Sequence, residues 1–155
     1  MKSSTLIIHA KGAPGLRFFG LGPNFIPCNG MHSLKKLMNK YAFWSKDRSL
    51  NQIRQLLANS NVIVSVWSKG EIIGFGRATS DCVFRAVLWD IIVVDKLQGK
   101  GIGRQIVDTL LKTKSVAKVE KVYLMTTNYS DFYSQFGFEV LSKQSLMLKQ
   151  RKGIN

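Results

Sequence analysis

Residues 91–111 join a short apolar run, a glycine-rich loop and an amphipathic stretch in one continuous segment. The run at 91–94 is entirely β-branched, which favours a buried strand. Gly99, Gly101 and Gly103 follow, and residues 105–111 then carry apolar side chains at helical spacing. A helix that begins directly after such a turn points its unbonded N–H groups at whatever lies in front of it. We therefore expect an anion-binding site at this turn.

The composition of the loop favours a diphosphate. Glycine has no Cβ, so backbone N–H groups approach phosphate oxygens closely, while Lys100 and Arg104 add positive charge. A P-loop is excluded because the chain has no Gly-Lys-Ser/Thr ending. A dinucleotide fingerprint is excluded because Ile106 stands where its third glycine is required. The alternative is a tight strand-to-helix turn that binds nothing.

The string that does fit is Gln-x-x-Gly-x-Gly, filled by Gln98, Gly101 and Gly103. It resembles the acetyl-CoA pyrophosphate loop of the GNAT superfamily of N-acetyltransferases. The resemblance implies that acetyl-CoA is the cosubstrate, with backbone amides of residues 92–94 binding the pantetheine arm and the acetyl oxygen. The residues that it assigns to the cofactor are Ile92, Val93, Val94, Gln98, Gly99, Lys100, Gly101, Ile102, Gly103 and Arg104.

A second motif lies at 131–138, after an expected strand at 121–125. The residues Phe132, Tyr133, Gly137 and Phe138 are similar to the Phe-Tyr-x-x-x-Gly-Phe signature of the same superfamily. We expect a short helix that carries Tyr133 and ends at Gly137. The resemblance implies that Tyr133 is a general acid near the CoA sulfur. The alternative is a core aromatic with no part in chemistry.

Transfer of an acetyl group to an amine requires a neutral amine, and an alkyl ammonium has a pKa of about 10.4. Asp90, on the expected central strand, is the first candidate for a base, and Asp81 is the second. The alternative for Asp90 is an ion pair with Arg77 or Arg85, and for Asp81 a turn. No acyl-enzyme is expected, because Cys28 lies in the expected irregular arm and Cys82 has no histidine nearby in the sequence. The expected route is direct attack in a ternary complex.

The acceptor is a primary amine, but its identity stays open. Residues 73–81 together with Trp89 resemble a cyanobacterial and plastid branch that includes plant serotonin N-acetyltransferases. An arylalkylamine such as serotonin and a protein lysine or N-terminal amine are both compatible with that branch. Tyr41, Phe43 and Trp44 either line an acceptor pocket or anchor helices in the core.

The remaining patterns predict the architecture. Ser33 is the expected N-cap of a helix at 34–41, and Asp47 or Ser49 that of a helix at 50–57. Lys69 and Gly70 are expected to form a hairpin turn. Strands are expected at 62–67, 71–79, 83–94, 121–125 and 146–148, and a further helix reaches about 114. This order gives a mixed α/β (α+β) sheet and matches the GNAT fold, with splayed central strands and flanking helices. Residues 1–30 are expected to be an irregular arm, and 31–155 a single domain.

The chain is strongly basic, with a net charge of +14 over 155 residues. Part of this charge suits a polyanionic cofactor; the rest is compatible with solubility or with a nucleic acid or ribosome partner. A non-catalytic CoA sensor or RNA-associated protein is therefore the alternative function. No metal site and no membrane association are expected, since cysteine and histidine are not clustered and no apolar run reaches about 18 residues. We expect a monomer or homodimer in a reducing compartment, either the cytoplasm or the plastid stroma.

Overall fold

The computed structural model describes residues 3–151, which form two compact units. One unit ends at Met125 and the other begins at Thr126. The expectation of one domain over 31–155 stays a prediction, and residues 1–2 and 152–155 lie outside the described part. No helix among the described residues is long and apolar enough to cross a membrane.

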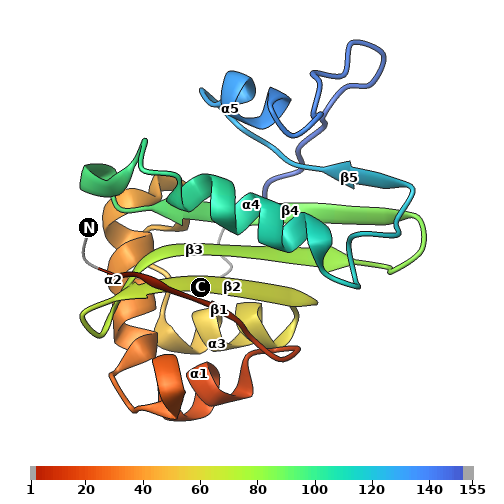
Figure 1. Ribbon diagram of the computed structural model, residues 1–155. Coiled ribbons are helices and arrows are strands. Elements are labelled where there is room, and N and C mark those ends of the chain that lie inside the picture. The colour runs from red at the N-terminus through yellow and green to blue at the C-terminus, as the bar shows by residue number, and fades with distance from the viewer. Residues whose placement is uncertain (1–2, 152–155) are drawn as a thin grey trace. The chain divides into compact units, whose positions relative to one another are not determined.

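A mixed sheet forms the centre of the first unit (Figure 1). Its strands lie in chain order, as β1 (Thr5–Ile8), β2 (Val62–Ser68), β3 (Glu71–Ser80), β4 (Arg85–Val93) and β5 (Lys121–Tyr123). Neighbouring strands are antiparallel, except that β4 and β5 are parallel and are connected through helix α4 (Ile102–Lys112). The predicted mixed α/β sheet with flanking helices is confirmed.

Helices cover both faces of this sheet. One face carries α1 (Pro14–Phe19), α2 (Gly30–Tyr41) and α3 (Leu50–Ala58), with the short 3-10 turns η1 (Pro23–Phe25) and η2 (Phe43–Ser45) between them. Their buried side chains form the main core with those of the sheet, among them Leu16, Leu34, Met38, Ile53, Leu57, Ile63, Trp67, Phe75 and Ile92. Helix α4 covers the other face. A Cβ on Gly74 would lie 3.0 Å from Ile102 and from Ile106, so this glycine permits close helix–sheet contact.

The predicted irregular arm at 1–30 is wrong for residues 5–8 and 14–19. Strand β1 pairs with β2 as the edge of the sheet, and α1 buries Leu16 completely. Pro14 occupies the start of α1, where its missing N–H costs nothing, and Gly20 ends the helix with a φ of 62°. The prolines and glycines therefore delimit short elements instead of preventing them.

Of the predicted helix N-caps, one is confirmed and one is wrong. Ser49 caps α3 as expected, and its side chain forms a reciprocal capping box with Gln52. The predicted cap at Ser33 is wrong because α2 begins earlier, at Gly30. The hydroxyl of Ser33 instead accepts a hydrogen bond of 2.8 Å from the backbone N–H of Ile72, which ties α2 to β3.

Two strand predictions are corrected. Residues 146–148 form no strand, and Leu146, Met147 and Leu148 are exposed, because no strand lies among residues 126–151 to pair with them. Strand β4 begins at Arg85 rather than at 83. The N–H groups that residues 83 and 84 would contribute to a ladder are bound by a side chain of the preceding turn.

A buried polar group in the sheet links β1 to β2. The indole N–H of Trp67 donates to the hydroxyl of Ser65 at 2.7 Å, and His9 Nε2 lies 2.7 Å from the same oxygen. A hydroxyl has one proton and two lone pairs, so Ser65 can accept from Trp67 and still either donate to His9 or accept from it, and a neutral imidazole fits both arrangements. Burial lowers the pKa of His9 to about 4.

Acidification is expected to destabilise the fold through His9. The pKa of this group is 6.5 in the unfolded chain and about 4 in the folded one, so stability present above pH 6.5 is lost progressively towards pH 4. The full loss is about 3 kcal/mol. Denaturant titrations from about pH 7 to about pH 4.5 should show a smaller loss in His9→Gln than in wild type. The exposed His32 supplies the control, His32→Gln; an equal loss in His9→Gln and wild type would contradict the assignment.

Candidate active site

Strand β4 contains a β-bulge at its centre. Between two neighbouring cross-strand pairs, β3 contributes Gly76 alone, whereas β4 contributes Asp90 and Ile91. Asp90 adopts a φ of 52°, a left-handed conformation that is strained in a residue other than glycine. A Cβ on Gly76 would lie 2.8 Å from Ile91, so the residue opposite the bulge must be small. The sequence therefore holds a strained backbone at the middle of the central strand.

The side chain of Asp90 explains how this strain is tolerated. Its carboxylate accepts a hydrogen bond of 2.7 Å from Arg77 Nε and one of 2.8 Å from the indole N–H of Trp44. Arg48 lies 3.6 Å from it on the same side, and only 4% of the Asp90 side chain is exposed. Of the two ion pairs considered for Asp90, the one with Arg77 is present, whereas Arg85 pairs with a different carboxylate. The cluster fixes the bulge to β3 and to the loop that precedes α3.

Asp81 has a local role. One carboxylate oxygen accepts backbone N–H bonds from Val83, Phe84 and Arg85, at 2.7 to 2.9 Å. The bonds from Arg85 and Val83 are the main reason that the pKa of Asp81 lies below its usual range. A carboxylate with these partners closes the β3–β4 turn, and this favours the turn interpretation over the base.

Strand β4 has an open edge beside the bulge. It pairs with β5 only over residues 85–87, and β5 ends at Tyr123, so the first unit offers β4 no partner on that side further along. The N–H of Val94 donates to Ile73 at 3.0 Å and is thus already used on the β3 side. Because successive residues of a strand direct their polar groups to opposite sides, the N–H of Val93 faces the open edge. The short pairing leaves this edge of β4 open, and the predicted splaying of the two central strands stays a prediction.

The glycine loop leads from this edge to α4. After the 3-10 turn η3 (Asp95–Leu97), Gly99 and Gly101 adopt φ values of 73° and 84°. Gly101 is the N-cap of α4, and no side chain caps the helix. A Cβ added to either glycine would meet nothing within 4 Å, so the space in front of the helix N-terminus is open. Lys100 is exposed between them. This arrangement fits an anion with several oxygens.

Gln98 braces the loop from within. Its side-chain amide donates to the carboxylate of Asp95 at 3.1 Å and to the backbone carbonyl of Val93 at 3.3 Å. The amide therefore holds the turn against the end of β4. Its predicted contact with the cofactor stays a prediction, as do those of Ile102, Gly103 and Arg104 at the start of α4. Ile92 turns its side chain into the core, and the alternation that places the Val93 N–H at the open edge directs the Ile92 N–H towards β3.

Tyr133 belongs to the second unit. It lies on α5 (Ser130–Ser134), and the helix is closed as expected by Gly137, with a φ of 85°. The N–H groups of Gly137 and Phe138 return to the carbonyls of Ser134 and Tyr133 at 3.0 and 3.3 Å, the pattern of a Schellman motif. Burial, with a smaller contribution from Tyr129, raises the pKa of Tyr133 to about 12. The phenol therefore keeps its proton at neutral pH.

Comparison with known proteins identifies the family. The family model described as "Acetyltransferase (GNAT) domain" matches residues 58–140, which include the bulge, the glycine loop and the Tyr133 motif. The chain belongs to the GNAT acetyltransferase family. Among solved structures, a protein from Xanthomonas campestris assigned to the GNAT family superposes with a TM-score of 0.71 at 19% identity, covering 97% of this chain and 96% of the other. This likeness shows that the chain adopts the fold of GNAT acetyltransferases.

Two curated relatives indicate the branch of the family. The GNAT chain is 30% identical over 113 residues to "Uncharacterized N-acetyltransferase ycf52" of Pyropia yezoensis, covering 70% of this chain and 64% of that protein. It is 35% identical over 82 residues to "Serotonin N-acetyltransferase 2, chloroplastic" of Oryza sativa, covering 46% of this chain and 40% of that protein. The alignments thus span less than two thirds of each relative.

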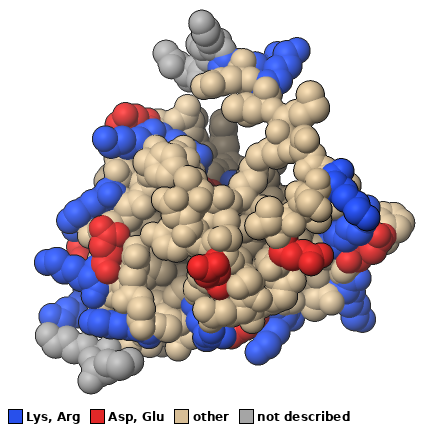
Figure 2. Space-filling view, turned by 90° about the horizontal axis from the view of Figure 1, so that it is seen from above, with Lys and Arg blue, Asp and Glu red and all other residues tan. Residues whose placement is uncertain are grey.

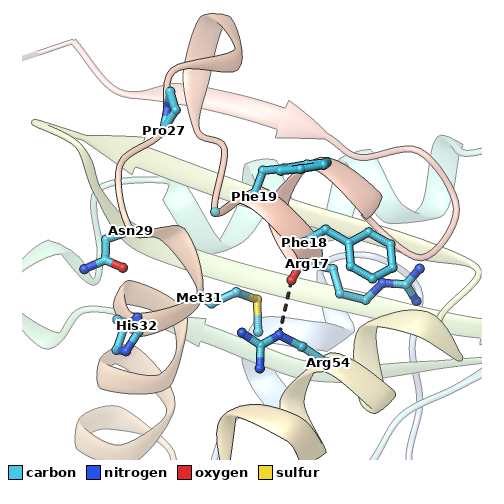
Figure 3. Close-up of a pocket in the computed structure, with 9 residues that line it drawn as sticks. Arg17, Phe18, Phe19, Pro27, Asn29, Met31, His32 and Arg54 are labelled. Carbon is cyan, nitrogen blue, oxygen red and sulfur yellow. Dashed lines mark hydrogen bonds between the residues drawn. The ribbon is translucent and has the colours of Figure 1, made fainter.

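The cavity in Figure 3 lies outside this site. It has a volume of about 350 Å³, and its lining comes from α1, α2, α3 and the segments between α1 and α2. Arg54 donates to the carbonyl of Arg17 at its centre, at 3.3 Å. No residue of β4 or α4 lines this cavity. It is therefore separate from the bulge and the glycine loop.

Sequence reasoning missed Trp44 and Arg48 as partners of Asp90. Both precede Asp90 by more than 40 residues, and neither stands in a motif. The one available signal was the cluster Tyr41, Phe43 and Trp44, which we interpreted as a pocket or a core anchor. In the structure Phe43 and Trp44 are 76% and 48% exposed. The indole therefore reaches Asp90 from the surface.

Proposed function

We propose that the protein is an acetyl-CoA-dependent N-acetyltransferase that acts on a primary amine by direct attack in a ternary complex. One observation carries the proposal: the uncapped N-terminus of α4, behind a loop of open glycines, directly follows a bulged strand with a free edge. A diphosphate at the loop brings a pantetheine arm alongside that edge. Family membership and the open space at Gly99 and Gly101 support this fit.

The loop is proposed to bind acetyl-CoA through its phosphates. The N–H groups of Ile102 and Gly103 point along the axis of α4 towards the open space, where the helix dipole favours negative charge. Lys100 and Arg104 add positive charge to the same side. Acetyl-CoA supplies a thioester, whose carbonyl oxygen becomes negative during attack by the amine. The N–H of Val93, at the open edge, is the proposed donor to that oxygen.

Asp90 is proposed to position the bulge rather than to remove a proton. Its carboxylate is nearly fully buried and already accepts bonds from Arg77 and Trp44. Accepting a proton would cancel the charge that pairs with Arg77 and leave a buried guanidinium without its counterion. The carboxylate instead stabilises the strained backbone from which the N–H of Val93 is presented. The alternative is that Asp90 removes the proton from the amine, and the pH dependence of the variants distinguishes the two roles.

Asp90→Asn and Arg77→Gln are expected to lower kcat by a similar factor, of about ten or more. Each variant breaks the same ion pair, so each loosens the bulge, while the pH dependence of kcat/KM keeps its wild-type form. The measurement is a pH–rate profile for both variants, with circular dichroism to confirm folding. Loss of the acidic limb in Asp90→Asn alone would show that Asp90 is the base.

The activity itself is tested by calorimetry followed by an acceptor screen. Acetyl-CoA is titrated into the protein, and the complex is then incubated with serotonin, tyramine and a lysine peptide while free CoA is measured. Binding followed by CoA release is the expected result. Binding without release from any amine would favour the non-catalytic CoA sensor, and no binding would overturn the assignment of the loop.

The proposed location is the plastid rather than the cytoplasm. The support is the printed name of the rice relative, which places that protein in the chloroplast. The basic side chains do not indicate a location. Figure 2 shows Lys and Arg at separate places on the face in view instead of in one stripe. Localisation of a fluorescent fusion of the full-length protein tests this proposal.

A further inference from the structure

A basic segment, residues 35–48, lies beside the bulge of β4. Residues 35–48 contain five Lys or Arg and one acid, namely Lys35, Lys36, Lys40, Lys46 and Arg48 against Asp47. The segment runs from α2 through η2 towards α3, and Trp44 joins it to Asp90 at 2.8 Å. It folds back on α2, since the N–H of Asp47 donates to Asn39 at 3.2 Å. Lys36 is paired with Glu71 at 2.9 Å, so Lys40 and Lys46 supply the positive charge next to Trp44 in this segment.

The Asp90 cluster adds to this charge. One carboxylate faces two guanidinium groups, Arg77 at 2.7 Å and Arg48 at 3.6 Å, which leaves one positive charge in excess. The nearest Arg48 nitrogen is buried and makes no hydrogen bond within the described residues. A cationic acceptor thus finds no unpaired carboxylate in this cluster, whereas an acidic acceptor meets its excess positive charge at the 30% of the Arg48 side chain that is exposed.

The same segment presents an exposed aromatic pair. Phe43 and Trp44 meet edge to face with ring centres 5.1 Å apart, and 76% and 48% of their surfaces are exposed. Lys40 and Lys46, which flank the pair in the sequence, are exposed as well. An aromatic surface bordered by cations suits an extended segment with both apolar and acidic side chains.

We infer that the acceptor amine is borne by an acidic peptide, which binds across Phe43 and Trp44 with its carboxylates on Lys40, Lys46 and Arg48. This inference rests on the proposed acetyltransferase function and specifies its substrate class. It differs from what the rice relative's name suggests, because serotonin is a cation with no carboxylate. Charge complementarity carries the assignment: a positive border attracts an acidic peptide and repels a basic one.

The first experiment compares peptides that differ only in charge. Each carries one lysine and one leucine, flanked either by glutamates or by cationic side chains that have no amine to acetylate. Serotonin is included as a small cationic amine. CoA release is expected to give a kcat/KM for the acidic peptide at least about tenfold above that of the basic peptide and of serotonin at low salt. The advantage should shrink as salt is raised, because exposed charges are screened.

The second experiment changes the surface. Lys40→Glu combined with Lys46→Glu is expected to lower kcat/KM for the acidic peptide several-fold and to leave the Kd of acetyl-CoA unchanged. Lys114→Glu combined with Lys118→Glu makes the same change in net charge on the exposed segment after α4, and is expected to have little effect.

Three outcomes would overturn the inference, and they are distinguishable. A preference for serotonin or for the basic peptide would refute the substrate class while the acetyltransferase stands. Equal loss in both double variants would attribute the effect to overall charge instead of this surface. Failure of every acceptor to release CoA would instead refute the proposed function, and the inference with it.

Discussion

Replacing Gly101 with glutamate is expected to abolish acetyl-CoA binding, with a Kd raised by about 100-fold or more, which corresponds to about 3 kcal/mol. Gly101 is the N-cap of α4 and has a φ of 84°, a conformation that disfavours any L side chain. The new side chain would occupy the open space in front of the helix, and its carboxylate would repel a diphosphate there. The measurement is isothermal titration of acetyl-CoA.

The chain contains a matched control for this substitution. Gly70, in the hairpin between β2 and β3, has a φ of 76°, and an added Cβ there also meets nothing within 4 Å. Gly70→Glu therefore introduces the same backbone strain and the same charge outside the loop. We expect both variants to fold, with only Gly101→Glu losing the ligand. Equal affinity in folded Gly101→Glu and wild type would refute the loop assignment.

Local signals account for what the sequence predicted well. The glycine loop, the Ser49 cap and the Gly137 helix end are each decided by residues within a few positions of one another. Their backbone preferences do not depend on distant partners. The loop could thus be placed between a strand and a helix before any fold was known, and so could the helix that carries Tyr133.

Long-range partners explain what the sequence did not reveal. Strand β1 is only four residues long, in a region rich in glycine and proline, and it exists because β2 supplies hydrogen bonds from nearly 60 positions away. Ser33 looked like a cap, but its hydroxyl is bound to Ile72. The most consequential case is Asp90, whose partner Trp44 lies 46 positions earlier. Propensity and motif contain no information about such contacts.

The strain at Asp90 illustrates why the functional part of the chain is the hardest to predict. A left-handed aspartate inside a strand contradicts local preference, and it persists because Arg77, Trp44 and Gly76 over-determine it. Such conflicts between local and global preference are expected at functional sites. The bulge was therefore the feature least accessible from the sequence, and it is the one on which the proposed presentation of the Val93 N–H depends.

Tyr133→Phe is expected to lower kcat by about 100-fold or more, with little change in the Kd of acetyl-CoA, if the phenol donates the proton that the departing CoA thiolate requires. The substitution keeps the ring, which packs edge to face on Phe132 with centres 5.0 Å apart, so the second unit should retain its fold. Tyr129→Phe removes an exposed hydroxyl from the same unit and serves as the comparison; because Tyr129 makes only the smaller contribution to the raised pKa of Tyr133, its effect on kcat should be small. The measurements are kcat from CoA release and Kd from titration.

The pH dependence gives a second, independent readout of Tyr133. Burial raises its pKa from 10.0 to about 12, and a raised phenol pKa means that the neutral, proton-donating form persists to higher pH. An acid with this pKa keeps its proton throughout the range in which an alkyl ammonium, with a pKa of about 10.4, becomes neutral and able to attack. The rate should therefore rise with pH towards about pH 10 without a decline from this group. A fully active Tyr133→Phe variant would show that the residue has only a packing role. A wild-type rate that already declines at a pH well below 10 would show that a different acid donates the proton.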